Sequence, residues 1–249
     1  ERHSHAFPNC GFGGGGICHG SPYHRLGVEH ALPSCEAFRG EDGRKDLLGY
    51  VYHSGYNDLD VQELVSIISD GELPEANHVT DGYPEFTDWP NSWDSSTHQT
   101  MYYRWIERAY LGGMRLLVNY ATGNSVLCDL ITGLEFQEPR YSCNDMVSVD
   151  RTLEESWALE RYIDAQHGGP GEGWFRIVET PEQARQVIQE GKLAVVLGIE
   201  ISNVFDCFLT APDETPICDL AHVQEQLDTY HDLGVRALYP NHKFDNAFT

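Results

Sequence analysis

Apolar residues in the second half of the chain recur first at helical spacing and then in short unbroken runs. The first such unit comprises a helix predicted over about 97–111, a stop at Gly112 and Gly113, and a strand predicted over 114–121. Glycine weakens a helix and tolerates the turn that follows it. The pattern therefore predicts a helix followed directly by a buried strand.

The same unit recurs with clearer end signals between residues 180 and 199. Thr180 and Gln183 have the spacing of a capping box, and Pro181 occupies the position that proline favours at the start of a helix. Gly191 ends this helix, and the apolar run after it predicts a strand over 192–199.

A third unit spans residues 219–239. Asp219 is placed to cap a helix, Gly234 closes it, and a strand is predicted over 235–239. The apolar face of this helix is formed by Leu220, Val223, Leu227 and Tyr230. Helices that alternate with short apolar strands predict a parallel sheet covered by helices, either an open doubly wound sheet or a (β/α)₈ barrel.

The first part of the chain has no such regularity. Residues 6–59 contain the run GFGGGG and several cysteines, so we expect a long irregular insertion held by disulfides, with Cys10 and Cys18 as a candidate pair. A helix is predicted from Asp60, and an aromatic-rich loop over 80–94.

These patterns divide one predicted domain, residues 1–249, into three parts. The irregular insertion covers 6–59, a helix with an aromatic loop covers 60–95, and regular alternating helices and strands cover 96–249. A chain of this length with 41% hydrophobic residues can bury a sizeable core.

The charge and cysteine content narrow the possible partners and compartment. With 16 Lys and Arg against 39 Asp and Glu, the formal charge of -23 repels phosphate backbones, which argues against a nucleic-acid partner. No apolar run approaches the roughly 20 residues of a membrane-spanning helix. Seven cysteines, mostly in Gly/Pro-rich stretches, favour disulfides and hence a secreted or periplasmic protein.

Four ionisable residues stand out by their placement. His3 and His5 are two positions apart, so on an extended strand both imidazoles project to one face and can reach one cation. Glu200 and His242 each follow a predicted strand, and the carboxyl ends of parallel strands carry the chemistry in both candidate folds. A solvated terminus for the histidines and a structural ion pair for Glu200 remain open alternatives.

Two sequence stretches resemble the membrane (renal) dipeptidase-like family of metal-dependent amidohydrolases. GKLAVVLGIE followed by a helix and DLGVRALYPNH resembles the part of that family in which one strand ends in a metal-bridging glutamate and the next in Thr-His. The preceding DAQHGGPGEGWFRIVETPEQARQVIQEG resembles the helix, loop and helix before that glutamate. The match covers roughly residues 150–246 and the N-terminal histidine motif.

The resemblance implies a TIM-type (β/α)₈ barrel of the amidohydrolase type, of which this chain is the N-terminal half. It implies that Glu200 bridges metal ions, that His3 is a metal ligand of the first strand, and that His242 polarises the substrate or steadies the tetrahedral intermediate. The family's barrel continues through further strands with two more metal histidines and a catalytic aspartate. We therefore expect a second polypeptide, or a C-terminal half, that completes the barrel.

The chain departs from the dipeptidase pattern at two places. His5 stands where the dipeptidases carry aspartate, which gives the His-x-His of the wider amidohydrolase superfamily. Residues Ile201, Ser202 and Asn203 stand where the family has Gly-Gly-His. The resemblance thus carries over the hydrolase class and not dipeptide specificity.

The leading functional hypothesis is hydrolysis of an amide, peptide or related carbonyl bond in a small-molecule or peptide substrate. His3, His5 and Glu200 would hold one or two divalent ions, with zinc the expected metal, and His242 would stabilise the developing oxyanion. A metal-dependent phosphoesterase ranks lower. A secreted non-catalytic binding or surface-assembly protein on the same barrel is the alternative from another class.

Overall fold

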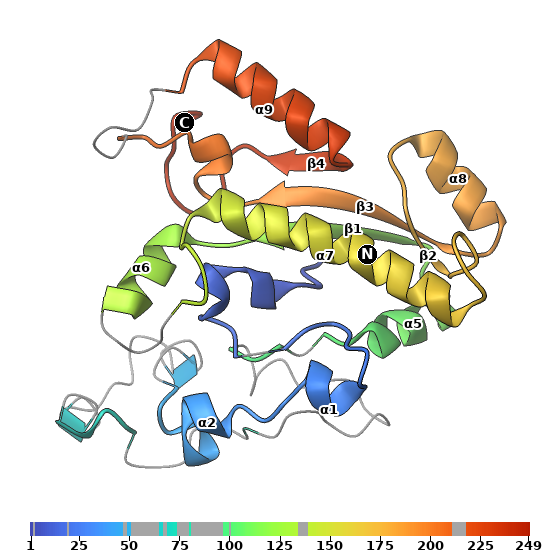
Figure 1. The fold of residues 1–249 in the computed structure, drawn as a ribbon. Helices are drawn as coiled ribbons and strands as arrows, with labels where there is room; N and C mark the ends of the chain where they lie inside the picture. The colour runs from blue at the N-terminus through green and yellow to red at the C-terminus, as the bar shows by residue number, and fades with distance from the viewer. Residues whose placement is uncertain are drawn as a thin grey trace.

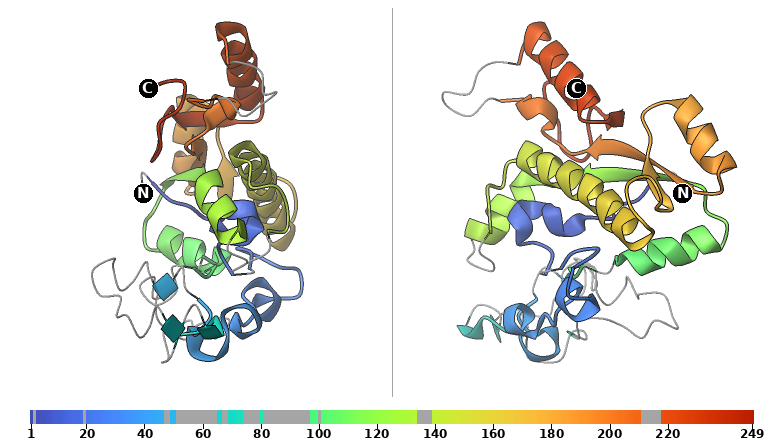
Figure 2. Two further views of the ribbon diagram at one scale, coloured as in Figure 1. Left: turned by 90° about the vertical axis from the view of Figure 1, so that its left-hand side faces the viewer. Right: turned by 45° about the vertical axis from the view of Figure 1, so that its right-hand side comes forward.

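A computed structural model shows a mixed α/β fold built around an open parallel sheet (Figure 1). The sheet lies across the middle of the molecule, and the irregular N-terminal region lies below it (Figure 2). The structure describes residues 1, 3–18, 20–46, 49–50, 65–66, 69–73, 80, 97–99, 101–133, 139–210 and 218–249.

The sheet is centred on β3 (Leu193–Glu200), whose residues are almost all buried. β1 (Leu116–Thr122) pairs with β3 in parallel along its whole length. β2 (Phe175–Ile177) and β4 (Val235–Tyr239) pair in parallel with the start and the end of β3, so both lie along its other edge. The parallel sheet expected from the alternating pattern is confirmed.

The N-terminal segment extends the sheet beyond β1. The backbone N–H of Ser4 donates to the Val118 carbonyl at 3.0 Å, and that of Tyr120 donates to the Ser4 carbonyl at 2.8 Å. Ser4 and Asn119 form a parallel bridge. The N-terminal segment, β1, β3 and β4 therefore lie side by side in the order in which the chain supplies them.

Helices connect the strands and pack against them. α7 contacts β1 and β2, α8 contacts β3, and α9 contacts β4. The helices of this part are α5 (Tyr103–Leu111), α6 (Ser125–Gly133), α7 (Asp145–Gln166), α8 (Pro181–Gln189) and α9 (Leu220–Asp232). Among the described helices, none combines the length and the apolar character needed to cross a bilayer.

The predicted helix ends are confirmed where the sequence supplies strong caps. Thr180 and Gln183 form both arms of the capping box, and the Asp219 carboxylate accepts from the backbone N–H of His222. The helix expected from residue 97 instead begins at Tyr103. The Gln99 side-chain amide donates to the Ala6 and Met101 carbonyls, so tertiary contacts hold this stretch out of the helix.

The irregular N-terminal region contains only short helical segments, yet its first residues enter the main core. Ala6 and Phe7 are buried together with residues of the sheet and of α7. The segments are η1 (Pro8–Cys10), η2 (Phe12–Gly14), α1 (Val28–Ala31), α2 (Glu36–Arg39) and η3 (Glu41–Gly43), and η4 (Val204–Asp206) follows β3.

Three disulfides are present, which confirms that the loops are cross-linked. They join Cys18 to Cys35, Cys128 to Cys143, and Cys207 to Cys218. The pair expected between Cys10 and Cys18 is wrong, and Cys10 is free and buried. Cys10 packs in the main core, whereas Cys18 is held away from it by a backbone bridge to His98. Proximity in sequence does not bring two sulfur atoms together when the backbone directs them apart.

The helix predicted from Asp60 and the aromatic loop over 80–94 lie, apart from a few positions, outside the described residues. The division of the chain at residues 60 and 96 stays a prediction.

Candidate metal centre

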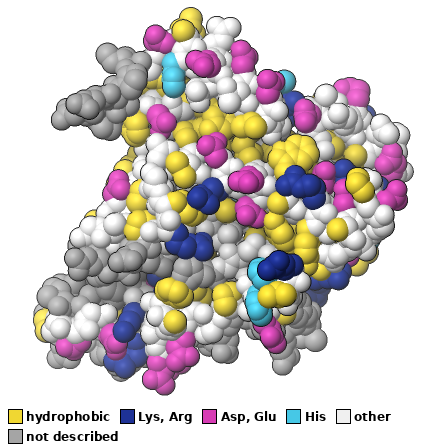
Figure 3. Space-filling view, viewed as in Figure 1, with side chains coloured by type: hydrophobic (Ala, Val, Ile, Leu, Met, Phe, Trp, Pro, Cys, Tyr) yellow, Lys and Arg dark blue, Asp and Glu magenta, His cyan; other side chains and the backbone are white. Residues whose placement is uncertain are grey.

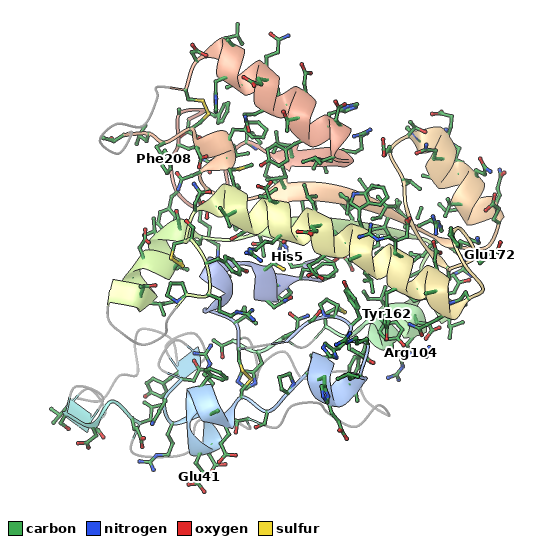
Figure 4. The ribbon with its side chains drawn as sticks, in the orientation of Figure 1. His5, Glu41, Arg104, Tyr162, Glu172 and Phe208 are labelled. Carbon is green, nitrogen blue, oxygen red and sulfur yellow. A yellow bond between two sulfur atoms is a disulfide. The ribbon has the colours of Figure 1, made fainter. Side chains whose placement is uncertain are left out.

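The site lies at the carboxyl end of the sheet, where three strands bring polar side chains together. Thr122 is the register partner of Glu200 across β1 and β3, and Glu200 is the partner of Tyr239 across β3 and β4. The N-terminal segment runs along β1 with Ser4 opposite Asn119, so His3 and His5 flank this pairing on one face. Figure 4 shows His5 on this segment, close to the sheet.

One carboxylate oxygen of Glu200 faces both N-terminal imidazoles. The Nε2 atom of His3 lies 2.7 Å from Glu200 Oε2, and the Nε2 atom of His5 lies 3.3 Å from the same oxygen. The two Nε2 atoms are 3.2 Å apart. The structure thus brings together the three residues that the sequence singled out as ligands.

The spacing of these three atoms fits a single small cation. A circle through them has a radius of about 1.8 Å, which is shorter than the roughly 2.0–2.2 Å bonds that zinc forms with imidazole nitrogen and carboxylate oxygen. Imidazole nitrogen and carboxylate oxygen are also a donor set that zinc prefers. The residues present therefore fit a divalent metal ion.

The backbone sets the tautomer of His5. Its Nδ1 atom lies 3.0 Å from the Tyr120 carbonyl oxygen, which can only accept a hydrogen bond. Nδ1 must therefore carry the proton, and the Nε2 atom of the neutral ring presents its lone pair toward Glu200. Histidines that bind a metal through one ring nitrogen usually donate the N–H of the other ring nitrogen to a carbonyl or carboxylate oxygen.

Glu200 is buried at the end of a buried strand, with 6% of its surface exposed. No described residue donates a hydrogen bond of acceptable geometry to its Oε2 atom, although two histidines surround it. A buried carboxylate without donors is costly, by roughly 1–3 kcal/mol or more. A cation at Oε2 would remove this cost.

His242 lies on the opposite side of the same carboxylate. Its Nε2 atom is 3.2 Å from Glu200 Oε1, and its Nδ1 atom is buried with no hydrogen-bond partner among the described residues. Burial lowers the pKa of His242, and the Glu200 carboxylate opposes that effect only in part. The structure therefore brings the four candidate residues together, with three histidines around the Glu200 carboxylate.

Two tyrosines that the sequence analysis missed form an aromatic wall beside His3. The ring centroids of Tyr120 and Tyr239 lie 4.9 and 6.0 Å from that of His3. Tyr120 lies over Gly198, where a Cβ would stand 2.5 Å from the tyrosine ring. A glycine inside an apolar strand marks a close approach of this kind, so Gly198 was the available signal.

A buried aspartate, also missed, supports the loop that follows Glu200. The backbone N–H of Asn203 donates to Asp145 Oδ2 at 3.1 Å, and burial raises the pKa of Asp145. Asp145 lies at the start of α7, next to the N-cap Asn144. No local sequence signal indicated this contact, because the two partners are 58 residues apart.

A second group of ligand-type residues, Cys207, Cys218 and His222, lies near the end of β3. Its two sulfur atoms form a disulfide, and His222 Nε2 is 2.8 Å from the Phe205 carbonyl. Their ligand atoms are therefore already engaged. No protein-family model, curated protein or solved structure matches this chain.

Proposed function

We propose that this protein is a metal-dependent hydrolase that acts on an amide, peptide or related carbonyl bond. The observation that carries the proposal is the convergence of His3, His5 and Glu200 at the carboxyl ends of parallel strands. Such strand ends are where α/β enzymes build their active sites. The resemblance of residues 150–246 to the membrane dipeptidase family supports the same reaction class.

His3, His5 and Glu200 would hold one or two divalent ions, with zinc the expected metal. A bound ion supplies a water molecule of lowered pKa and polarises the carbonyl group of the substrate. The Tyr120 carbonyl keeps the His5 ring in the tautomer that a ligand needs. The Asp145 contact to Asn203 keeps the loop after Glu200 in place.

His242 is the residue that we assign to the substrate. It lies on the Oε1 side of Glu200, away from the oxygen that faces His3 and His5. Burial lowers the pKa of His242, which favours a neutral ring with a single N–H. In this structure Nε2 faces Glu200 Oε1, which can only accept, so the N–H would have to leave that oxygen in order to donate to an oxyanion.

The proposed architecture is the N-terminal half of a TIM-type (β/α)₈ barrel. Its support is the strand order. Apart from the three-residue β2, which precedes β3 in the chain but lies on its far edge, the N-terminal segment, β1, β3 and β4 follow one another without the reversal of a doubly wound sheet. A second polypeptide or a C-terminal half would add the next parallel strands to β4. The three disulfides favour an oxidising compartment, so we propose that the protein is secreted or periplasmic.

Two other functions fit the site less well. A phosphoesterase needs cationic side chains near the metal. Arg236 pairs with Glu179 at 2.7 Å and Lys192 bonds the Gly171 carbonyl, both at the amino ends of their strands, which leaves Lys243 beside His242 as the cation nearest the site among the described residues. A non-catalytic binding protein on the same barrel would not need ligand-type geometry at His5 and Glu200. The phosphoesterase and the binding protein each predict an outcome of the experiment below that differs from that of the proposed hydrolase.

The test is metal content, measured by elemental mass spectrometry on the protein purified without chelators together with any co-eluting chain. We expect about one or two zinc-like ions per assembly, lost in a His3→Ala/Glu200→Ala variant. The matched control is His167→Ala/Glu182→Ala, whose side chains are exposed after the end of α7 and at the start of α8. The control should retain the metal.

A well-folded assembly without metal would overturn the hydrolase proposal and favour a binding protein. Metal that persists in the His3→Ala/Glu200→Ala variant would place the ion elsewhere. Metal-loaded protein that hydrolyses phosphoesters and not a panel of peptides and amides would favour the phosphoesterase.

A further inference from the structure

A polar cleft of about 390 Å³ lies between α7 and the N-terminal region and shares no residue with the metal centre. We call it the α7 cleft, and the lining residues that matter here are Asn9, Arg140, Tyr141, Arg151, Glu154 and Glu155. Its volume lies within the range of small-molecule sites. Figure 3 shows basic and acidic side chains next to each other on the face of the molecule that carries α7.

Asn9, one of the lining residues, has an unsatisfied acceptor. The residue is buried, with 7% of its surface exposed, and its Oδ1 atom has no hydrogen-bond partner among the described residues. Its backbone is fixed, since its N–H donates to Gln99 Oε1 at 3.3 Å. Buried acceptors of this kind are normally satisfied, so Oδ1 remains available to a donor from a ligand or from solvent that reaches it.

Two arginines bring positive charge to the lining of the cleft. The Arg151 guanidinium lies 3.9 Å above the ring of Tyr141, whose hydroxyl donates to the Cys10 carbonyl at 2.8 Å. Arg140 uses Nε to donate to the Gly14 carbonyl at 3.0 Å. Neither guanidinium forms an ion pair with a carboxylate in the described part of the chain, so both can receive an anionic group.

Two glutamates on the next turn of α7, beside Arg151, add negative charge to the lining of the cleft. Glu155 accepts from the Tyr23 hydroxyl at 2.9 Å, and Glu154 is exposed beside it. The cleft thus carries two positive and two negative side chains within a chain of net charge -23. A ligand that carries both a positive and a negative group could pair with side chains of both signs in this cleft.

The free cysteine in the cleft does not suggest covalent chemistry. Burial, with a smaller effect from the Glu155 carboxylate, raises the pKa of the Cys10 thiol to about 12. The thiol is neutral near pH 7, and a neutral buried thiol is a poor nucleophile. The cleft is therefore suited to reversible binding.

We propose that the α7 cleft binds a small zwitterion of the amino acid or short peptide class. The ligand carboxylate would pair with Arg140 and Arg151, and its ammonium or amide N–H would donate to Asn9 Oδ1 and Glu154. Arginine is suited to the carboxylate because its planar fork donates two parallel hydrogen bonds.

The probe is trialanine, titrated into the purified protein and followed by isothermal titration calorimetry. We expect saturable binding of trialanine and no measurable binding of N-acetyl-trialanine amide, which lacks both charges. Arg151→Gln and Asn9→Ala should each weaken trialanine binding by at least about tenfold. The matched control is Arg161→Gln, an exposed arginine on α7 outside the cleft, which should leave binding unchanged.

The His3→Ala/Glu200→Ala variant separates this site from the metal centre. Trialanine binding that survives in this variant and is lost in Arg151→Gln supports the cleft. Binding that is lost in the metal-ligand variant and retained in Arg151→Gln would overturn it, as would the absence of any trialanine binding or equal binding of the blocked peptide. Circular dichroism of each variant checks the fold, and Arg151 is exposed, so its replacement should not unfold α7.

Discussion

At the scale of single residues, Glu200 holds the site together, because both of its oxygens face imidazole nitrogens. His3 and His5 approach one oxygen, and His242 approaches the other. Two interpretations of this arrangement differ in what balances the charge of the Glu200 carboxylate. In a metal site the balancing charge is the metal ion, whereas in a structural ion pair it is a protonated histidine.

Glu200→Gln distinguishes these interpretations. We expect the variant to bind zinc at least about 100-fold more weakly in a chelator-competition assay, since an amide oxygen replaces a charged ligand. Without metal, its melting temperature should equal or exceed that of the native protein, because a buried charge has been removed.

The control for this variant is Glu190→Gln, an exposed glutamate at the end of α8, which should change neither quantity. A metal-free Glu200→Gln protein that is less stable by about 3–5 kcal/mol would instead show that Glu200 is half of a structural ion pair.

At the scale of secondary-structure elements, one arginine joins α7 to the loop and strand that follow it. Arg176 of β2 contacts Asp164 at 2.7 Å and Glu160 at 2.9 Å, both on α7. Asp164 also accepts from the backbone N–H groups of Gly171 and Gly173. This network fixes the end of the long helix against the sheet edge.

Asp164 gives this network a defined pH dependence. Burial raises the pKa of Asp164, but the hydrogen bonds from Gly171 and Arg176 outweigh that effect and lower it. A lowered folded-state pKa means that the stabilisation is present above the unfolded value, near 4, and is lost as the pH falls through the folded value. We expect Asp164→Asn to cost about 1–3 kcal/mol at pH 7 and progressively less below about pH 4.

Urea unfolding between about pH 7 and pH 2 measures this difference. Glu182→Gln serves as control, because the Glu182 carboxylate is exposed and pairs only with the neighbouring Arg185. A constant difference between Asp164→Asn and the native protein at all pH values would contradict the assignment. Glu160 acts in the opposite sense, since burial raises its pKa.

At the scale of the whole molecule, the free edge of the sheet carries an apolar surface. Leu220, Leu227 and Leu233 in and after α9 are exposed, and an apolar cavity of about 360 Å³ lies between α9 and β4. Figure 3 shows apolar side chains in a band below α9. The unpaired edge of β4 can form backbone hydrogen bonds with a further strand, and the apolar surface beside it would be buried by that pairing.

We expect the protein from its native source to co-elute with a second polypeptide, or to continue into further chain, that adds parallel strands to β4. Native mass spectrometry would show a constant added mass above 28.1 kDa. For a separate polypeptide, Leu227→Lys should abolish co-elution, because Leu227 lines the apolar cavity. Leu26→Lys, at an exposed leucine in the N-terminal region, should preserve it.

A metal-loaded, well-folded 28.1 kDa monomer would contradict this prediction and leave the hydrolase proposal standing. Co-elution that Leu227→Lys does not affect would place the partner on another surface.

Much of the fold was predictable because its signals are local. The capping box at Thr180, the helix stop at Gly191 and the apolar run before Glu200 each act within a few residues. The Cys10–Cys18 pairing and the helix start at residue 97 were wrong because distant contacts decide them. Burial in the core and a hydrogen bond from Gln99 override what the nearby sequence suggests.

The sequence by itself determined the alternation of helices and strands, and it placed Glu200 at a strand end and two imidazoles on one face of an extended segment. Only the tertiary structure decided that these groups meet, because the pairing of the N-terminal segment with β1 spans more than one hundred residues. The tautomer of His5, the tyrosine wall and the α7 cleft have the same origin. Each depends on atoms from segments far apart in the chain, and no local pattern records such contacts.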